Sequence, residues 1–178
     1  MLIGFTGLKG SGKDTAAQAV QGVNLKMAGG LKAMLTAFYE YAGLDGFTIQ
    51  RKIEGDLKEE PCPYLMGATP RWAMQSLGSD WAKMVDPEHR IWVEIWRVAA
   101  EQHLKVGHPV VCTDVRFQHE LDVIHQLGGR VIRIERPGVD LDDLHESEVK
   151  MLGLVVDHTI MNDGSIEDLL NEVTRCIH

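Results

Sequence analysis

Cysteine is scarce in this chain, and its spacing excludes the usual cysteine-based architectures. Only three cysteines occur among the 178 residues, namely Cys62, Cys112 and Cys176, and no two of them form a C-x-x-C pair. A disulfide framework or a structural zinc site is therefore not expected. This composition favours a reducing cytoplasm as the location.

Long apolar runs and an excess of basic residues are also missing. No run approaches the ~20 apolar residues of a membrane span, and the N-terminus shows no signal-peptide pattern, so no membrane partner is expected. Lys and Arg total 18 against 26 Asp and Glu, a formal net charge of −8. Because a broad nucleic-acid surface is normally basic, nucleic acid is not an expected partner either. Small phosphorylated ligands stay compatible, since they need only a local positive pocket.

Short apolar segments alternate with helical patterns along the chain, which predicts an α/β fold with a parallel sheet flanked by helices. We expect one domain over residues 1–178, with a possible substrate-side loop or insertion at 43–68 and a polar, acidic flap at 138–152. The main strands are predicted at 2–6, 109–113, 131–135 and 159–161, with a short one at 23–27.

Helix signals are clearest in the first half of the chain. Gly29-Gly30 is interpreted as a break, after which an apolar face is predicted from helical spacing. Thr69-Pro70 indicates a helix start, with Thr as N-cap and Pro in the first turn, and Gly78 is the predicted stop. Ser79 is expected to cap the following segment. The predicted apolar face comprises Leu31, Met34, Leu35, Phe38 and Tyr41.

A glycine-rich stretch, GLKGSGKD, lies between the first predicted strand and a helix predicted at 14–20. It fits G-x-x-x-x-G-K at Gly7, Gly12 and Lys13, the pattern of a phosphate-binding loop. Gly7, Gly10 and Gly12 let the backbone curl and point N–H groups inward, and Lys13 can reach the β- and γ-phosphates of a nucleotide. A glycine-rich turn without a ligand is the alternative.

Asp14 stands where this loop pattern has Ser or Thr, and Thr15 follows it. A carboxylate beside a triphosphate is repulsive unless a cation lies between them, and Mg²⁺ prefers oxygen ligands. We therefore expect Asp14 to hold Mg²⁺ directly or through water, with Thr15 contributing its hydroxyl. The alternative is an acidic residue in the first helical turn with no catalytic role.

The segment VVCTDVRFQHE places three charged residues after a buried strand, Asp114, Arg116 and Glu120. In parallel sheets ligands bind at the carboxyl ends of the strands, where Gly7, Asp114 and Arg136 all fall. An acid there can steady Mg²⁺, and the Arg116 guanidinium can clamp a phosphate through two parallel hydrogen bonds. The alternative assigns Asp114 to capping the helix and Arg116 to a surface ion pair.

Three further residues carry weaker signals for a nucleotide. Arg71 and Gln75 are four residues apart on one predicted helix face, where a cation and an amide would suit a phosphate and a base edge. A solvated helix face explains that spacing equally well. Arg136, at the root of the predicted flap, is the best candidate for a charge clamp on the donor.

Several stretches together resemble the deoxynucleoside monophosphate kinases of tailed bacteriophages, a family of P-loop nucleotide kinases. The resemblance covers most of the chain outside about residues 43–68. The matching stretches are LKGSGKDT, MAGGLKAML, RWAMQSLGSDW, RIWVE, VVCTDVRFQHELDVIHQLGGRVIRIERPG and HTIMNDGSIEDL.

That resemblance implies a P-loop fold of nucleoside-kinase type, a homodimer, and transfer of the γ-phosphoryl group of ATP to a deoxynucleoside monophosphate. For a phage-encoded protein it also implies the host cytoplasm as the location. It implies that Lys9 and residues 11–15, beginning with Ser11, hold ATP. It also implies that the monophosphate site is formed or bordered by Lys32, Arg71, Trp92, Asp114, Arg116 and Glu120. A kinase of another small acceptor, such as a coenzyme precursor or a sugar, and a non-catalytic nucleotide-binding regulator are the competing hypotheses.

Overall fold

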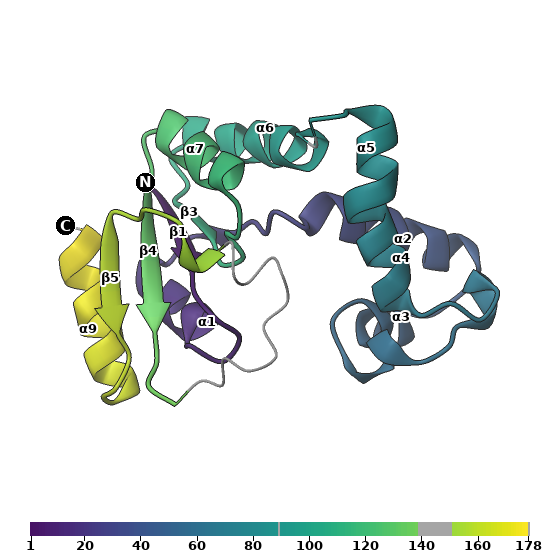
Figure 1. Ribbon diagram of the computed structural model, residues 1–178, viewed down its shortest axis with the longest axis horizontal. Coiled ribbons are helices and arrows are strands. Elements are labelled where there is room, and N and C mark those ends of the chain that lie inside the picture. The colour runs from purple at the N-terminus through teal and green to yellow at the C-terminus, as the bar shows by residue number, and fades with distance from the viewer. Residues whose placement is uncertain (89, 139–150, 178) are drawn as a thin grey trace. The chain divides into compact units, whose positions relative to one another are not determined.

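Five parallel strands form one sheet in the computed structural model, which describes residues 1–88, 90–138 and 151–177 (Figure 1). The strand order is β2-β3-β1-β4-β5, so the first strand in the chain lies at the centre. Gly4 pairs with Cys112 on one side and with Val131 on the other, which brings the carboxyl ends of three strands to one edge. The strands are β1 (Leu2–Thr6), β2 (Val23–Asn24), β3 (Val110–Cys112), β4 (Arg130–Glu135) and β5 (His158–Met161).

Different helices cover the two faces of this sheet. The side chains of Ile3 and Phe5 join one buried cluster with residues of α1 (Lys13–Ala16), η1 (Ala17–Val20) and α9 (Ile166–Ile177). Gly4 faces the other side, because successive strand residues alternate, and it lies against Ile124 of α7 (Gln118–Gln126). The predicted α/β fold with a helix-flanked parallel sheet is confirmed.

The chain divides into two compact units, which are described separately. The sheet belongs to the unit of residues 1–27 and 96–178, and the other unit comprises Ala28–Ile95. Helix α6 (Ile91–Lys105) begins in the second unit and continues in the first. The second unit is helical in its described residues and contains α2 (Gly29–Tyr41), α3 (Gly46–Ile53), η2 (Asp56–Glu59), η3 (Pro63–Leu65), α4 (Pro70–Ser76), η4 (Leu77–Trp81) and α5 (Ala82–Val85).

Helix α2 differs from the sequence prediction at its start and in its buried face. Gly29 and Gly30 are its first residues rather than a break, and a Cβ on Gly30 would lie 3.1 Å from the Trp92 ring, so the glycine permits a close approach. Two apolar stripes run along the helix. The stripe of Leu31, Leu35 and Tyr39 is buried. Met34, Phe38 and Tyr41, which belong to the predicted apolar face, are exposed.

The helix that begins at Pro70 is confirmed at its start but not at its end. The Thr69 side chain accepts a hydrogen bond from the Trp72 backbone N–H, as an N-cap does. Gly78 does not stop the helix, because the chain continues through the π-helical turn η4 into α5. Ser79 does not cap a new helix, since its hydroxyl donates to the carbonyl of Gln75 four residues earlier.

The segment 43–68 is more regular than a loop. It contains helix α3, whose N-cap Asp45 accepts a hydrogen bond from the Thr48 backbone N–H, and the turns η2 and η3. Most of the predicted flap, residues 139–150, lies outside the described residues. The extent of the domain stays a prediction. Each helix in the described part of the chain is too short or too polar to cross a membrane.

Candidate active site at the glycine loop

The loop from Gly7 to Lys13 needs glycine at its two ends. Gly7 has a φ of 137° and Gly12 a φ of 105°, a region that side chains disfavour. A Cβ on Gly7 would overlap the carbonyl oxygen of Ile134 in β4. A Cβ on Gly12 would lie 2.5 Å from the side-chain nitrogen of Asn162. The neighbouring strands therefore hold the loop in a shape that only glycine accommodates.

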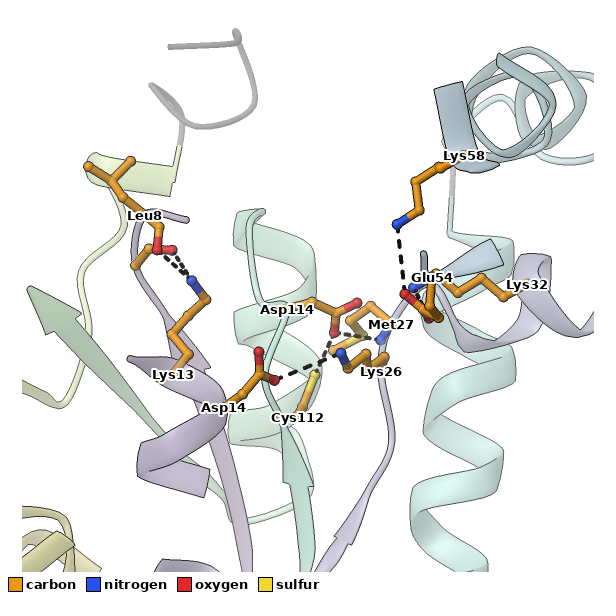
Figure 2. Close-up of polar contacts among 11 residues, drawn as sticks. Leu8, Lys13, Asp14, Lys26, Met27, Lys32, Glu54, Lys58, Cys112 and Asp114 are labelled. Atoms are coloured by element: carbon orange, nitrogen blue, oxygen red, sulfur yellow. Dashed lines mark hydrogen bonds and ion pairs between the residues drawn. The ribbon is translucent and has the colours of Figure 1, made fainter. Parts of the chain in front are cut away.

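The Lys13 ammonium group lies within the curve of this loop. Its Nζ donates hydrogen bonds to the carbonyl oxygens of Gly7 and Leu8, each at 2.7 Å (Figure 2). Ser11 is buried, and its hydroxyl has no hydrogen-bond partner among the residues that the structure describes. Asn162, just after β5, donates from Nδ2 to the Ser11 carbonyl at 2.8 Å. The loop thus presents the Lys13 ammonium group and the buried Ser11 hydroxyl, while Asn162 holds its backbone.

Asp14 and Thr15 follow the loop in α1. Asp14 is exposed, and its Oδ1 lies 3.8 Å from the Nζ of Lys26, which comes just after β2 (Figure 2). Thr15 is half-buried. In the described part of the chain, no group of three or more His, Cys, Asp or Glu side chains could hold a metal ion. The side-chain oxygens of Asp14 and Thr15 nevertheless suit Mg²⁺, because protein sites commonly hold this ion through one or two carboxylates together with substrate phosphates.

Asp114, at the carboxyl end of β3, fixes the segment that carries Lys26. Its Oδ1 accepts a hydrogen bond from the Met27 backbone N–H at 2.8 Å and lies 3.3 Å from the Cys112 sulfur (Figure 2). Burial is the main reason that the pKa of the Cys112 thiol is raised, and the Asp114 charge adds to it. Asp114 is therefore partly a positioning residue, because it holds the chain after β2 in place.

Arg116 is exposed two residues after Asp114, and Glu120 holds its backbone. The buried Glu120 carboxylate accepts hydrogen bonds from the backbone N–H groups of Arg116 at 2.6 Å and Phe117 at 3.1 Å. Burial raises the pKa of this carboxyl from 4.5 to about 7, against the lowering effect of those two donors. Glu120 was predicted to border the acceptor, and this geometry favours a role in positioning Arg116.

The raised pKa of Glu120 predicts a pH-dependent stability. Between pH 4.5 and 7 the folded protein keeps a proton that the unfolded chain releases, so the free energy of unfolding should fall as pH rises. Relative to that of Glu120→Gln, the free energy of unfolding of the wild type should fall by up to about 3 kcal/mol across that interval. Urea denaturation of both proteins at a series of pH values measures the difference. A difference that stays constant with pH would contradict this assignment.

A cavity of about 330 Å³ adjoins the loop on the β4 side. Gly7 and Ser11 line it from the loop, and Glu135, Arg136 and Gly138 line it from the end of β4 and beyond. Arg136 is exposed at its wall. This hollow therefore places a cation beside the loop that was predicted to bind phosphates.

The helical unit carries the other predicted acceptor residues. Lys32 in α2 pairs with Glu54, and Arg71 in α4 pairs with Glu59. Gln75 is exposed one helical turn after Arg71. Trp92 is buried, with its ring 5.4 Å from that of Trp81 and its indole N–H donated to the Leu77 carbonyl. Lys32, Arg71 and Gln75 are thus accessible, whereas Trp92 packs in the core of its unit.

Sequence reasoning overlooked two residues of the loop region, Lys26 and Asn162. Each lies just beyond the carboxyl end of a strand, which is the signal that could have indicated them. Neither lies in a pattern specific for ligand binding, and their partners Asp14 and Ser11 are distant in the sequence.

The comparisons with known proteins agree on one family. The model of the deoxynucleotide monophosphate kinase family matches residues 68–173. A protein of Acanthamoeba polyphaga mimivirus that carries this kinase name is 32% identical over 99% of this chain and 96% of its own length. The chain belongs to the deoxynucleotide monophosphate kinase family. The enzyme of that name from Enterobacteria phage T4 is 30% identical over 60% of this chain and 44% of its own length.

Solved structures show the same fold at low sequence identity. TT1252 from Thermus thermophilus has a TM-score of 0.52 at 18% identity, and covers 99% of this chain and 96% of its own. A sugar kinase from Janibacter has a TM-score of 0.52 at 13% identity, over 99% of this chain and 93% of its own. These likenesses concern the fold, and the predicted P-loop kinase fold is consistent with both.

Proposed function

We propose that this protein transfers the γ-phosphoryl group of ATP to the 5′-phosphate of a deoxynucleoside monophosphate, which gives the diphosphate and ADP. The observation that carries the proposal is the loop from Gly7 to Lys13, with its inward-turned ammonium group, in a chain of this kinase family. The names of the mimivirus and phage relatives supply the acceptor class.

The donor nucleotide belongs at the glycine loop. Phosphate oxygens there would accept hydrogen bonds from Lys13, from the buried Ser11 hydroxyl and from loop backbone N–H groups, with Lys9 and Gly10 at the exposed turn. The adjoining cavity, with Arg136 at its wall, has room for a further part of ATP. The otherwise unpartnered Ser11 hydroxyl supports this placement, because buried donors are normally satisfied.

Asp14 and Thr15 would hold Mg²⁺ beside the loop, since both offer the oxygen ligands that this ion prefers. When bound, Mg²⁺ neutralises negative charge on the β- and γ-oxygens of the nucleotide. Lys26, paired with Asp14, limits the repulsion between that carboxylate and the phosphates.

Asp14→Asn should raise the Mg²⁺ concentration needed for half-maximal activity, on the order of tenfold, because it removes a charged ligand. The KM for the monophosphate should change less. Activity measured against Mg²⁺ at fixed nucleotide concentrations tests this, with Asp122→Asn in the exposed part of α7 as a control. An unchanged Mg²⁺ dependence in a folded Asp14→Asn protein would favour the interpretation of Asp14 as an acid of the first helical turn.

The acceptor phosphate is already anionic, so it needs alignment and positive charge more than a strong general base. Arg116, held through its backbone by Glu120, is the proposed clamp in the sheet unit, beside Asp114. In the helical unit Lys32 and Arg71 supply cations, and Gln75 supplies an amide for a base edge. Trp92 would act by packing in the core of this unit, against Trp81, rather than by stacking on a base.

An acceptor panel tests the proposed function. ADP release is measured with ATP and each deoxynucleoside monophosphate, including modified pyrimidines, and with sugars and coenzyme precursors. Release with the monophosphates is expected. Release only with another acceptor would favour the alternative kinase, and binding of ATP without release would favour a regulator. The resemblance further supports a homodimer that acts on small nucleotides. The acidic net charge argues against nucleic-acid partners and the lack of a long apolar run against membrane partners, while the few cysteines favour the cytoplasm.

A further inference from the structure

A cluster of opposite charges joins four segments of the helical unit. Lys32 of α2 donates to Glu54, which follows α3, with 2.6 Å between Nζ and Oε1. The other oxygen of Glu54 lies 3.9 Å from the Nζ of Lys58 in η2 (Figure 2). Arg71 of α4 pairs with Glu59, the neighbour of Lys58. One carboxylate therefore bridges two ammonium groups, and the guanidinium group of Arg71 is paired with the residue next to Lys58.

The cluster carries a surplus of positive charge. Its three cations outnumber its two carboxylates by one, although the whole chain has a net charge of −8. This arrangement disfavours the charged form of Lys58. Burial lowers the pKa of its ammonium group, and the charges of Lys32 and Arg71 lower it further, while the charges of Glu54 and Glu59 oppose them. An added anion would relieve that repulsion.

Closing the turn after α3 does not require this cluster. Arg51 already spans the turn through two hydrogen bonds to Asp56, at 2.9 and 2.6 Å. Glu54 instead spreads its two oxygens over two different ammonium groups. A phosphate group offers oxygens to several cations in the same manner, and it carries more charge than a carboxylate. Glu54 thus occupies two cations that a phosphate could bind in its place.

We propose that Lys58 is a further binding residue for the acceptor phosphate, together with Lys32 and Arg71, and that Glu54 is an internal counter-ion that pairs with the two lysines until the phosphate displaces it. The inference rests on the proposed function, because the monophosphate group is the ligand that these cations would meet. It gives a role to η2, in a segment for which the sequence pattern suggested only a loop or insertion.

Lys58→Gln should raise the KM for the best monophosphate on the order of tenfold, the usual effect of losing a charged hydrogen bond. The KM for ATP should not change. Lys83→Gln, which alters an exposed lysine of α5 in the same unit, is the matched control and should leave both values unchanged. Lys58→Arg keeps the charge and should retain most of the affinity for the monophosphate.

Glu54→Gln separates the counter-ion role from a structural one. Without the competing charge, the KM for the monophosphate should fall, whereas the loss of a merely structural contact would raise it. Binding of the corresponding deoxynucleoside, which lacks the phosphate, should not change in either the Glu54 or the Lys58 variant.

The outcomes distinguish this inference from the proposed function. If the wild type phosphorylates monophosphates but Lys58→Gln behaves like Lys83→Gln, the inference is overturned and the proposed function stands. A rise in KM with both Glu54→Gln and Lys58→Gln also overturns it, since it indicates a structural contact. If the wild type phosphorylates no monophosphate, the proposed function fails and the inference fails with it.

Discussion

Lys13→Ala should reduce kcat on the order of 10³-fold or more, because it removes the cation that stabilises the moving phosphoryl group. The ammonium group lies within hydrogen-bonding distance of two loop carbonyls, so the loop sets its position before any nucleotide binds. A charge that is positioned in advance needs no rearrangement during the reaction, and this is why its removal should affect kcat more than binding.

The fold should survive this change. The helix after the loop is anchored by Ala16, Ala17 and Val20 in the buried cluster, and Asn162 holds the loop backbone. Urea denaturation and a coupled assay of ADP release test the two parts of the prediction. Lys9→Ala, which changes an exposed lysine of the same loop, should cost much less activity. A near-wild-type kcat in Lys13→Ala would remove Lys13 from the mechanism.

The second large effect is expected for Arg116→Lys, which should lower kcat/KM for the best monophosphate on the order of 10²-fold or more. A planar guanidinium group can grip two phosphate oxygens, whereas an ammonium group is a point charge. The Arg116 backbone is tied to the buried Glu120 carboxylate at 2.6 Å, so its side chain starts from a defined position. Conserving the charge would therefore not conserve the alignment.

ATP binding should change little in Arg116→Lys, and it is measured on the same protein. Arg130→Lys is the matched control, because Arg130 lies at the amino end of β4, away from the rim that holds Asp114. If ATP binding collapses while turnover of the monophosphate at saturating ATP is preserved, Arg116 belongs to the donor site.

Local patterns in the sequence were sufficient for the framework of the site. Strand β1, the glycine loop and the following helix could be placed because each depends on neighbours in the chain, as does the cap at Thr69. The helix after the loop was predicted as one element, and it is a short α-helix that continues as the 3-10 turn η1. The prediction that the carboxyl ends of the strands meet at one edge of the sheet followed from their parallel arrangement alone.

Local patterns could not decide which of two apolar faces is buried or where a helix ends. Helix α2 offers two apolar stripes, and Leu35 rather than Phe38 is buried because its side packs on α3 and α4. The turn at Gly78 stays helical because Leu77 and Trp81 pack in one cluster with Leu31 and Trp92. The same packing buries Trp92, which the sequence alone left as a candidate ligand contact.

By itself, then, the sequence determined the glycine loop, the alternation of strands and helices, and the rim where Asp114 and Arg116 emerge. These features rest on backbone preferences and on spacing within a few residues. The tertiary structure alone decided the distant partners of the charged groups, such as Lys26 for Asp14, Glu54 for Lys32 and Glu59 for Arg71. The physical reason is that a charge finds its partner across space, among groups that only folding brings within a few ångströms.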